Sequence, residues 1–262
     1  MRAQSGGARA VAAAFCSREH MSGIRLIVGL GNPGKAYEAT RHNAGFWLVE
    51  RFAARERITL RNDAKYHAYV GRHEPSGAWL LLPQTHMNAS GRSVGLLAGF
   101  FKIPASEILV AHDELDFPPG AAKIKQGGGI AGHNGLKDIA ARLGSLDFWR
   151  LRLGIGHPGD KGQVADYVLK KASPEDREAI DRSIERALEI LPLALSGDMQ
   201  GAMLKLHTAE IEAPVEKKAA PAAGQERKGE PSKESKDSDT KGGTIKSLLK
   251  SILPGSGSAR KK

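Results

Sequence analysis

The sequence predicts an α/β fold, a single three-layer α/β/α domain built on a twisted mixed sheet. Two observations support this fold class. Short apolar, β-branched runs alternate along the chain with longer segments in which apolar residues recur at helical spacing. Such alternation is typical of a sheet that helices cover on both faces. The patterned region spans roughly 185 residues, which is enough for one well-buried core.

Apolar patterns place the first elements along the chain. The run 24–29 is short, apolar, β-branched and bounded by glycines, which indicates a buried strand. After a loop that ends at Asn43, apolar residues return at helical spacing and predict a helix that ends near Arg57. Further on we expect two strands, a helix closed by Pro104 and a second buried strand, over residues 66–72, 78–83, 90–102 and 108–112.

The remaining elements follow a glycine-rich stretch. A helix is expected over residues 134–143, where Gly144 would stop it, and an alternating strand over 149–156. Residues 174–195 form a long amphipathic pattern with a proline in the first turn, which is typical of a surface helix. A last helical turn or two is expected over 200–207.

The two ends of the chain differ from this patterned body, which we place at residues 22–209. Residues 1–21 are expected to be a disordered extension or to precede the true start, because Met21 stands directly before the first strand. Their apolar stretch is too short for a signal-peptide core, and a transit peptide is the other interpretation. Residues 210–262 are rich in Lys, Glu, Ser and Pro and are expected to form a disordered tail. The basic amphipathic stretch 245–253 is either solvated or a segment that folds on RNA, a membrane or a partner.

The chain is basic, with a formal net charge of +10. Basic proteins suit a polyanionic partner such as RNA, whose counterions Lys and Arg release on binding, although moderate basicity can also serve solubility alone. Cys16 is the single cysteine, which excludes an internal disulfide. No apolar run approaches the roughly 20 residues of a membrane span. We therefore expect a cytoplasmic protein and a monomer.

The loop 29–34 (GLGNPG) has the G-x-G-x-x-G spacing of a dinucleotide-binding loop. That fingerprint needs a loop that runs straight into a helix, whose N-terminus holds the pyrophosphate. Here Pro33 makes a turn, and the next helical pattern starts only near Asn43. Glu50 stands at the distance of a ribose-binding acid but falls within that helix. These features argue against a nucleotide-dependent oxidoreductase.

An imidazole and a carboxylate are expected to meet at one edge of the sheet. His42 stands just before a predicted helix, Asp113 follows the strand 108–112, and Asn32 lies at the mouth of the first strand. Sites in open α/β sheets form beyond the carboxyl ends of the strands. Because a carboxylate fixes the tautomer of a neighbouring imidazole, His42 would be a base oriented by Asp113. The other interpretation of His42 is a helix cap or surface residue. No Ser or Cys nucleophile elbow is present, so water is the expected nucleophile.

Asn88 follows the strand that ends at Pro83, within the segment Met-Asn-Ala-Ser-Gly. An asparagine in such a turn usually bonds its own backbone. Its amide can instead bind a carbonyl or a ribose hydroxyl of a ligand. The residues alone leave both interpretations open.

Basic residues alternate in the segment 123–125, which would be a further strand, and in the strand 149–156. Lys123 and Lys125 would point to one face of their strand, and Arg150 and Arg152 have the same spacing. Together they would form either a patch that binds phosphates or an ordinary solvated face. The glycine-rich run 127–135 is not a Walker loop, because it lacks the Gly-Lys-Ser/Thr ending.

The histidines at positions 42, 112, 133 and 157 form no metal motif. They are scattered along the sequence, without an HExxH pair or a Cys/His cluster. We therefore expect neither a metal nor a cofactor.

Taken in order, six segments of the chain resemble the bacterial peptidyl-tRNA hydrolase family: VGLGNPG, TRHNAG, MNxSG, AHDELD, GGGxxGHNGLKD and RLRxGIGHPG. The resemblance runs from about Ile24 to His207 and excludes both ends of the chain. It implies a hydrolase that cleaves the ester between a peptide and the 3′-terminal ribose of tRNA, so that the expected partner is peptidyl-tRNA.

The resemblance also implies roles for individual residues. By motif match, His42 would be the general base on the attacking water, Asp113 would orient it, and Asn32 would hold the peptide or the water. A histidine of pKa about 6.5 suits activation of water near neutral pH. The implied substrate-binding residues are Asn88 and Asn134 for polar groups, Met87 and His133 along the peptide channel, and Tyr37 near the nucleotide end. The implied tRNA phosphate ligands are Lys123, Lys125 and Arg152.

A non-catalytic RNA-binding protein on the same fold is the competing function, since a fold does not fix a function. Such a protein would not need the pair His42 and Asp113. Here the pair is intact beside Asn32, Asn88 and Asn134. The sequence therefore favours the enzyme.

Overall fold

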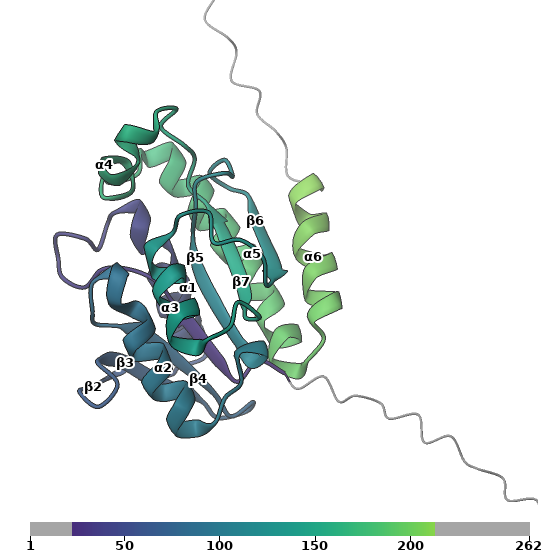
Figure 1. The fold of residues 1–262 in the computed structure, drawn as a ribbon. Helices are drawn as coiled ribbons and strands as arrows, with labels where there is room; N and C mark the ends of the chain where they lie inside the picture. Colours follow the sequence, from purple (N-terminus) through teal and green to yellow (C-terminus); the bar gives the residue numbers. More distant parts are fainter. Residues whose placement is uncertain (1–22, 213–262) are drawn as a thin grey trace, which may run out of the picture. The chain divides into compact units, whose positions relative to one another are not determined.

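The computed structural model describes residues 23–212. In this part of the chain seven strands form one mixed sheet in the order β2-β3-β4-β1-β5-β7-β6 (Figure 1). The strands β1, β4, β5 and β7 are parallel to one another, whereas β2, β3 and β6 pair antiparallel at the two sides. The bounds are β1 Leu26–Gly29, β2 Arg61–Asp63, β3 Ala68–His73, β4 Ala78–Pro83, β5 Ile108–Glu114, β6 Ala122–Gln126 and β7 Trp149–Gly154.

Helices cover both faces of this sheet (Figure 1). One face carries α1 (Ala44–Arg55), α5 (Pro174–Ser196) and α6 (Met199–Glu212), and the other carries α2 (Ser90–Phe101) and α3 (Asn134–Leu143). The side chains of β5 alternate between two cores. Leu109 and Ala111 pack with α1 and α5, whereas Ile108 and Val110 pack with α2 and α3. The three-layer α/β/α fold expected from the sequence is confirmed.

Two glycines allow helix α1 to lie directly against β1 and β5. A Cβ on Gly45 would overlap the carbonyl oxygen of Ala111, and a Cβ on Gly29 would overlap the carbonyl of Gly45. The N–H of Phe46 donates to the carbonyl of Leu30 at 3.1 Å. This close packing holds the residues just before α1 at the carboxyl ends of the parallel strands, where sites form in α/β sheets.

Most elements lie where the sequence pattern placed them. The predicted bounds of β4 and α3 are those observed, and other predicted elements differ by a few residues at their ends. Two elements were not predicted: β2, a polar and mostly exposed edge strand, and α4 (Val164–Val168), a helix of little more than one turn. Helix α6 continues to Glu212, so the expected boundary after residue 209 lies within its last turn.

The expected extension over residues 1–21 and the expected tail beyond residue 212 lie outside the described residues. Within residues 23–212, no helix combines the length and the apolar character that a membrane crossing requires.

Candidate active site

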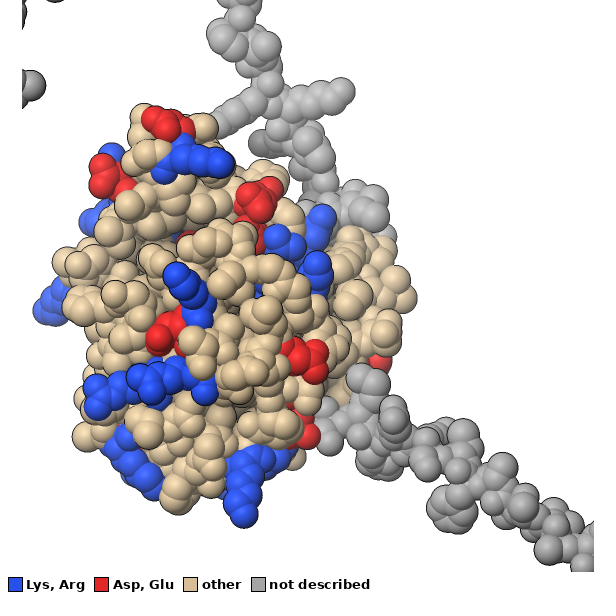
Figure 2. Space-filling view, in the orientation of Figure 1, with Lys and Arg blue, Asp and Glu red and all other residues tan. Residues whose placement is uncertain are grey.

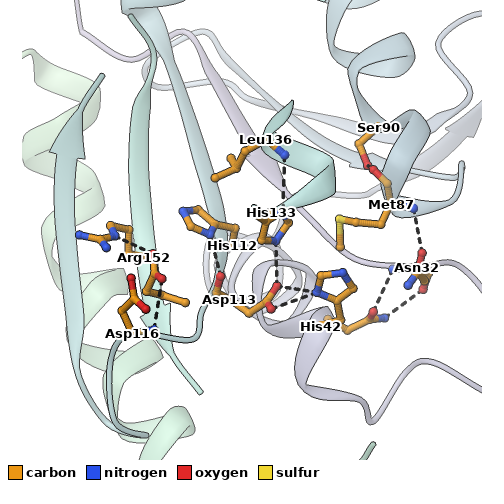
Figure 3. A network of polar contacts seen from close by, with 12 residues as sticks. Asn32, His42, Met87, Ser90, His112, Asp113, Asp116, His133, Leu136 and Arg152 are labelled. Atoms are coloured by element: carbon orange, nitrogen blue, oxygen red, sulfur yellow. Dashed lines mark hydrogen bonds and ion pairs between the residues drawn. The ribbon is translucent and has the colours of Figure 1, made fainter. Parts of the chain in front are cut away.

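His42 and Asp113 meet at the carboxyl edge of the sheet. His42 belongs to the short 3-10 turn Arg41–Asn43 that leads into α1, and Asp113 lies near the end of β5. Nδ1 of His42 lies 2.9 and 3.0 Å from the two carboxylate oxygens of Asp113 (Figure 3). Because an ionised carboxylate can only accept, Nδ1 carries the proton and Nε2 keeps its lone pair. His42 therefore has the tautomer that a general base needs.

Burial and charge act in opposite directions on this pair. Burial alone would lower the pKa of His42, but the charge and hydrogen bond of Asp113 outweigh it and raise that pKa above its usual value of 6.5. Burial would raise the pKa of Asp113, yet His42 and His133 together hold that pKa well below its usual range. The carboxylate thus stays ionised and stabilises positive charge on the base.

A second imidazole binds the same carboxylate. Nε2 of His133 donates to Oδ1 of Asp113 at 3.1 Å, and Figure 3 shows both rings directed at Asp113. His133 is also the N-cap of α3, because its Nδ1 accepts the N–H of Leu136 at 3.4 Å. The family resemblance implied a place for His133 along a peptide channel but did not indicate its bond to Asp113.

These three groups also have the spacing of a metal site. One ligand atom from each of His42, Asp113 and His133 lies within 4.8 Å of the others. However, the N–H of Leu136 points at Nδ1 of His133, which leaves the proton on Nε2, the atom that would face a metal. The arrangement favours hydrogen bonding to Asp113 over metal binding. That the protein needs no metal or cofactor stays a prediction.

His112 supports the cluster from within the sheet. Its Nδ1 donates to the carbonyl oxygen of Asp113 at 2.7 Å, and its ring meets that of His133 edge to face, with centroids 5.1 Å apart. Burial, and then the neighbouring His133, lower the pKa of His112 to about 3. His112 is therefore neutral at physiological pH and adds no charge that would compete with His42 for Asp113.

Asn32 is held by two neighbours so that its amide nitrogen can meet a ligand. The side chain of Asn43 accepts the N–H of Asn32 at 2.9 Å and donates to its carbonyl at 3.0 Å. The N–H of Met87 donates to Oδ1 of Asn32 at 2.8 Å (Figure 3). With Oδ1 engaged, Nδ2 of Asn32 is the group that can donate to a ligand. Asn32 is 7% exposed, so this amide is almost fully preorganised by the fold.

The other expected substrate-binding residues lie on different elements. Met87 is buried in the 3-10 turn before α2. Asn88 and Asn134 are exposed near the starts of α2 and α3, where their amides are accessible to a ligand. Tyr37 is partly buried in the turn that precedes His42. These residues come from three separate segments of the chain.

Basic side chains gather over β6 and β7 (Figure 2). The antiparallel register places Lys123 opposite Arg152 and Lys125 opposite Arg150. We call Lys123, Lys125 and Arg152 the basic patch. Nε of Arg152 donates to the buried carboxylate of Glu114 at 2.8 Å, and the Arg152 side chain remains 20% exposed.

Arg150 differs from the other three cations, although the sequence grouped it with them. It is 4% exposed, and its Nη1 donates to the carbonyl of Gly129. Arg150 thus holds the glycine-rich loop that leads to His133, and the expectation that it belongs to an exposed patch is wrong.

Three residues of the site were missed in the sequence. Asn43 clamps Asn32, Glu114 binds Arg152, and Asp138 accepts the N–H of Gly91 at 2.7 Å, which ties the start of α2 to α3. Each of them lies inside one of the six motif segments. Asn43 and Glu114 are buried and Asp138 is half-buried, and the sequence pattern does not show whether a single polar residue is buried.

The loop 29–34 does not have the structure of a dinucleotide-binding loop. It continues through a turn and the 3-10 turn Arg41–Asn43, and α1 begins only at Ala44. The loop therefore does not run straight into a helix, as the sequence predicted.

Comparison with known proteins identifies a family. A family model described as peptidyl-tRNA hydrolase matches residues 26–214. The chain is 56% identical over 189 residues to the peptidyl-tRNA hydrolase of Methylobacillus flagellatus, covering 72% of this chain and 98% of that protein. It is 51% identical over 208 residues to that of Delftia acidovorans, covering 79% and 100%. A crystal structure of peptidyl-tRNA hydrolase from Acinetobacter baumannii has 49% sequence identity and a TM-score of 0.69, covering 71% of this chain and 96% of that one.

Proposed function

The chain belongs to the peptidyl-tRNA hydrolase family and is an enzyme that hydrolyses the ester bond of peptidyl-tRNA, and we propose that His42 is the base that activates the attacking water. The observation that carries this assignment is the bond from Nδ1 of His42 to the ionised Asp113, which leaves Nε2 as the free base. Family membership also supports a catalytic protein over the non-catalytic RNA-binding alternative.

The proton moves through His42 in both halves of the reaction. Nε2 takes a proton from water as the oxygen attacks the ester carbonyl, and Asp113 stabilises the imidazolium that forms. When the tetrahedral intermediate collapses, the C–O bond to the ribose breaks and His42 returns the proton to the 3′ oxygen. The products are tRNA and the free peptide, whose new carboxylic acid group releases its proton to water. The imidazole ends in its starting state.

Asn32 supplies the donor for the negative charge that develops on the carbonyl oxygen. Its Oδ1 is engaged by Met87, so the amide N–H groups are directed at the ligand side. A donor that is already oriented costs no reorganisation in the transition state. Because His133 also binds the carboxylate of Asp113, its ring is held in place beside His42.

The exposed amides are suited to recognise the peptide. Asn88 and Asn134 would bind the polar groups next to the ester, while Met87 and His133 would line the apolar side of a peptide channel. A site built for the peptide amide leaves its polar groups unpaired when a free amino group enters, which disfavours ordinary aminoacyl-tRNA. Tyr37 would stack near the nucleotide end.

The basic patch would hold the tRNA. Lys123, Lys125 and Arg152 lie on β6 and β7, and β7 is the neighbour of β5, which carries Asp113. Phosphate contacts of this kind position an RNA without reading its sequence. Because tRNA is the substrate, we also propose that the protein acts in the cytoplasm, as a monomer.

The function is tested with a matched pair of substrates, N-acetyl-phenylalanyl-tRNA and phenylalanyl-tRNA. We expect cleavage of the blocked ester to exceed cleavage of the unblocked one by about a hundredfold or more. Equal cleavage of both would show a general esterase. Binding of tRNA without cleavage of either would support the RNA-binding alternative.

A further inference from the structure

Like charges stand directly opposite each other across β6 and β7. Lys123 faces Arg152 in the antiparallel register. Two cations at facing positions repel each other and destabilise a strand pair. Glu114 offsets part of this repulsion, because its carboxylate binds Nε of Arg152. A contact that attracts both cations without adding a negative charge would hold the two side chains together. It would also keep the positive charge that binds an RNA phosphate.

A neutral aromatic ring lies against both cations. Cζ of Arg152 lies 4.3 Å from the centroid of Phe117, and Nζ of Lys123 lies 5.0 Å from the same centroid. The face of an aromatic ring carries partial negative charge and attracts cations at such distances. The ring therefore holds the two side chains together without reducing their net charge.

The fold holds Phe117 in place through β7. Its carbonyl oxygen accepts the N–H of Gly156 at 2.8 Å. A Cβ on Gly154 would lie 2.8 Å from the Cβ of Phe117, so only glycine at that position allows this approach. Phe117 is thus part of the scaffold rather than a side chain that adapts to its neighbours.

The orientation of Arg152 follows from these two contacts. Glu114 binds its Nε edge, and its Cζ lies over the ring of Phe117. The terminal Nη groups are the remaining donors, and their fork matches two oxygens of one phosphate. Lys123 stands beside this fork and can add a single point charge.

We propose that Phe117 is a positioning residue of the tRNA site, whose ring holds Lys123 and Arg152 side by side so that both meet the phosphates of the same RNA strand. This rests on the proposed function of the basic patch. Phe117 touches neither the ester nor the catalytic base, so it acts on binding of the RNA and not on the chemical step.

The test compares Phe117→Leu with Phe117→Tyr. Leucine fills similar space against Gly154 but has no aromatic face, whereas tyrosine keeps the face. With N-acetyl-phenylalanyl-tRNA we expect Phe117→Leu to raise KM about three- to tenfold with little change in kcat, and Phe117→Tyr to remain near the wild-type value. Because both cations remain on their strands, the slope of log KM against log salt should change less in either variant than when a phosphate contact is lost outright.

The same blocked amino acid on a short CCA fragment provides the second readout. This substrate lacks the acceptor-stem phosphates, so its KM should not distinguish leucine from tyrosine. An unchanged KM for full-length tRNA in Phe117→Leu would overturn the proposal, as would an equal loss on both substrates or an equal loss in Phe117→Tyr. Failure of the wild-type enzyme to cleave either substrate would instead contradict the proposed function.

Discussion

The cluster around Asp113 and the basic patch lie on neighbouring strands, but their charged side chains are arranged in opposite ways. Asp113 is 3% exposed, and two imidazole N–H groups bind its carboxylate. In the basic patch, Lys123 and Arg152 face each other, and the carboxylate of Glu114 binds Arg152. One region buries a single charge between its partners, and the other gathers cations on facing strands.

The difference follows from what each region must do. A buried charge without partners is unstable, and a base works only when its lone pair is aimed at the reacting proton. A surface that binds a polyanion gains its affinity by replacing counterions of the RNA, so internal neutralisation would weaken it. Changes in the cluster should therefore lower kcat, and changes in the patch should raise KM.

The largest effect is expected from His42→Ala. Removal of the base should lower kcat for N-acetyl-phenylalanyl-tRNA by about two to four orders of magnitude, with KM nearly unchanged. His157→Ala is the matched control, because His157 is exposed and plays no part in the cluster. Near-normal kcat in a folded His42→Ala enzyme would remove His42 from the mechanism. A rise in KM with unchanged kcat would contradict the expectation that changes in the cluster act on kcat and changes in the patch act on KM.

Charge reversal of Lys123 and Lys125 to Glu should give a smaller effect of the other kind. We expect KM to rise roughly tenfold or more, and the slope of log KM against log salt to become shallower by about one for each phosphate that is no longer bound. The value of kcat at saturation should change little, because the cluster around Asp113 is untouched.

Arg55→Glu with Arg142→Glu is the control for net charge. Both residues are exposed in the last turns of helices that begin at the site, so they lie at the far end of the sheet. This variant should keep the wild-type KM and salt slope. If it matches the Lys123 and Lys125 variant, the overall charge rather than the patch binds tRNA.

The smallest effect is expected from removal of residues 213–262. Helix α6 ends at Glu212, and its buried Leu206 packs in the core, so the cut is placed after the helix. We expect kcat and KM for full-length tRNA to stay within about twofold of the intact chain, because every residue to which we assign a role lies within residues 23–212. A raised KM with a flatter salt dependence would show that the basic segment contributes to RNA binding.

Elements with a strong apolar pattern were predictable from the sequence, and weakly patterned ones were not. Strand β4 is apolar along its length, and α3 is stopped by Gly144, so both were predicted with the observed bounds. Strand β2 consists of Arg, Asn and Asp and forms only because β3 offers it a partner. Pairing of this kind depends on tertiary structure, which a local pattern cannot indicate.

Site residues could be predicted from the sequence where they lie next to the end of a helix or strand. His42 and Asp113 stand beside a helix start and within a strand end, so the topology alone brings them together. The bond from His133 to Asp113 depends on the path of the loop before α3, which includes three glycines with positive φ, at positions 127, 128 and 132. Arg150 is buried because that loop returns over it. Loop paths set by several glycines are too variable to predict from residue types.

The pH dependence of cleavage by wild type and Asp113→Asn tests most directly whether Asp113 sets the state of His42. Single-turnover rates with N-acetyl-phenylalanyl-tRNA would be measured from about pH 5 to 8, the range in which a histidine titrates. Because Asp113 raises the pKa of His42, the wild-type rate should increase with pH through a midpoint above 6.5. In Asp113→Asn the charge is lost while burial remains, so the midpoint should move to lower pH and the plateau should fall by roughly a hundredfold or more. An unchanged midpoint in Asp113→Asn would contradict the account.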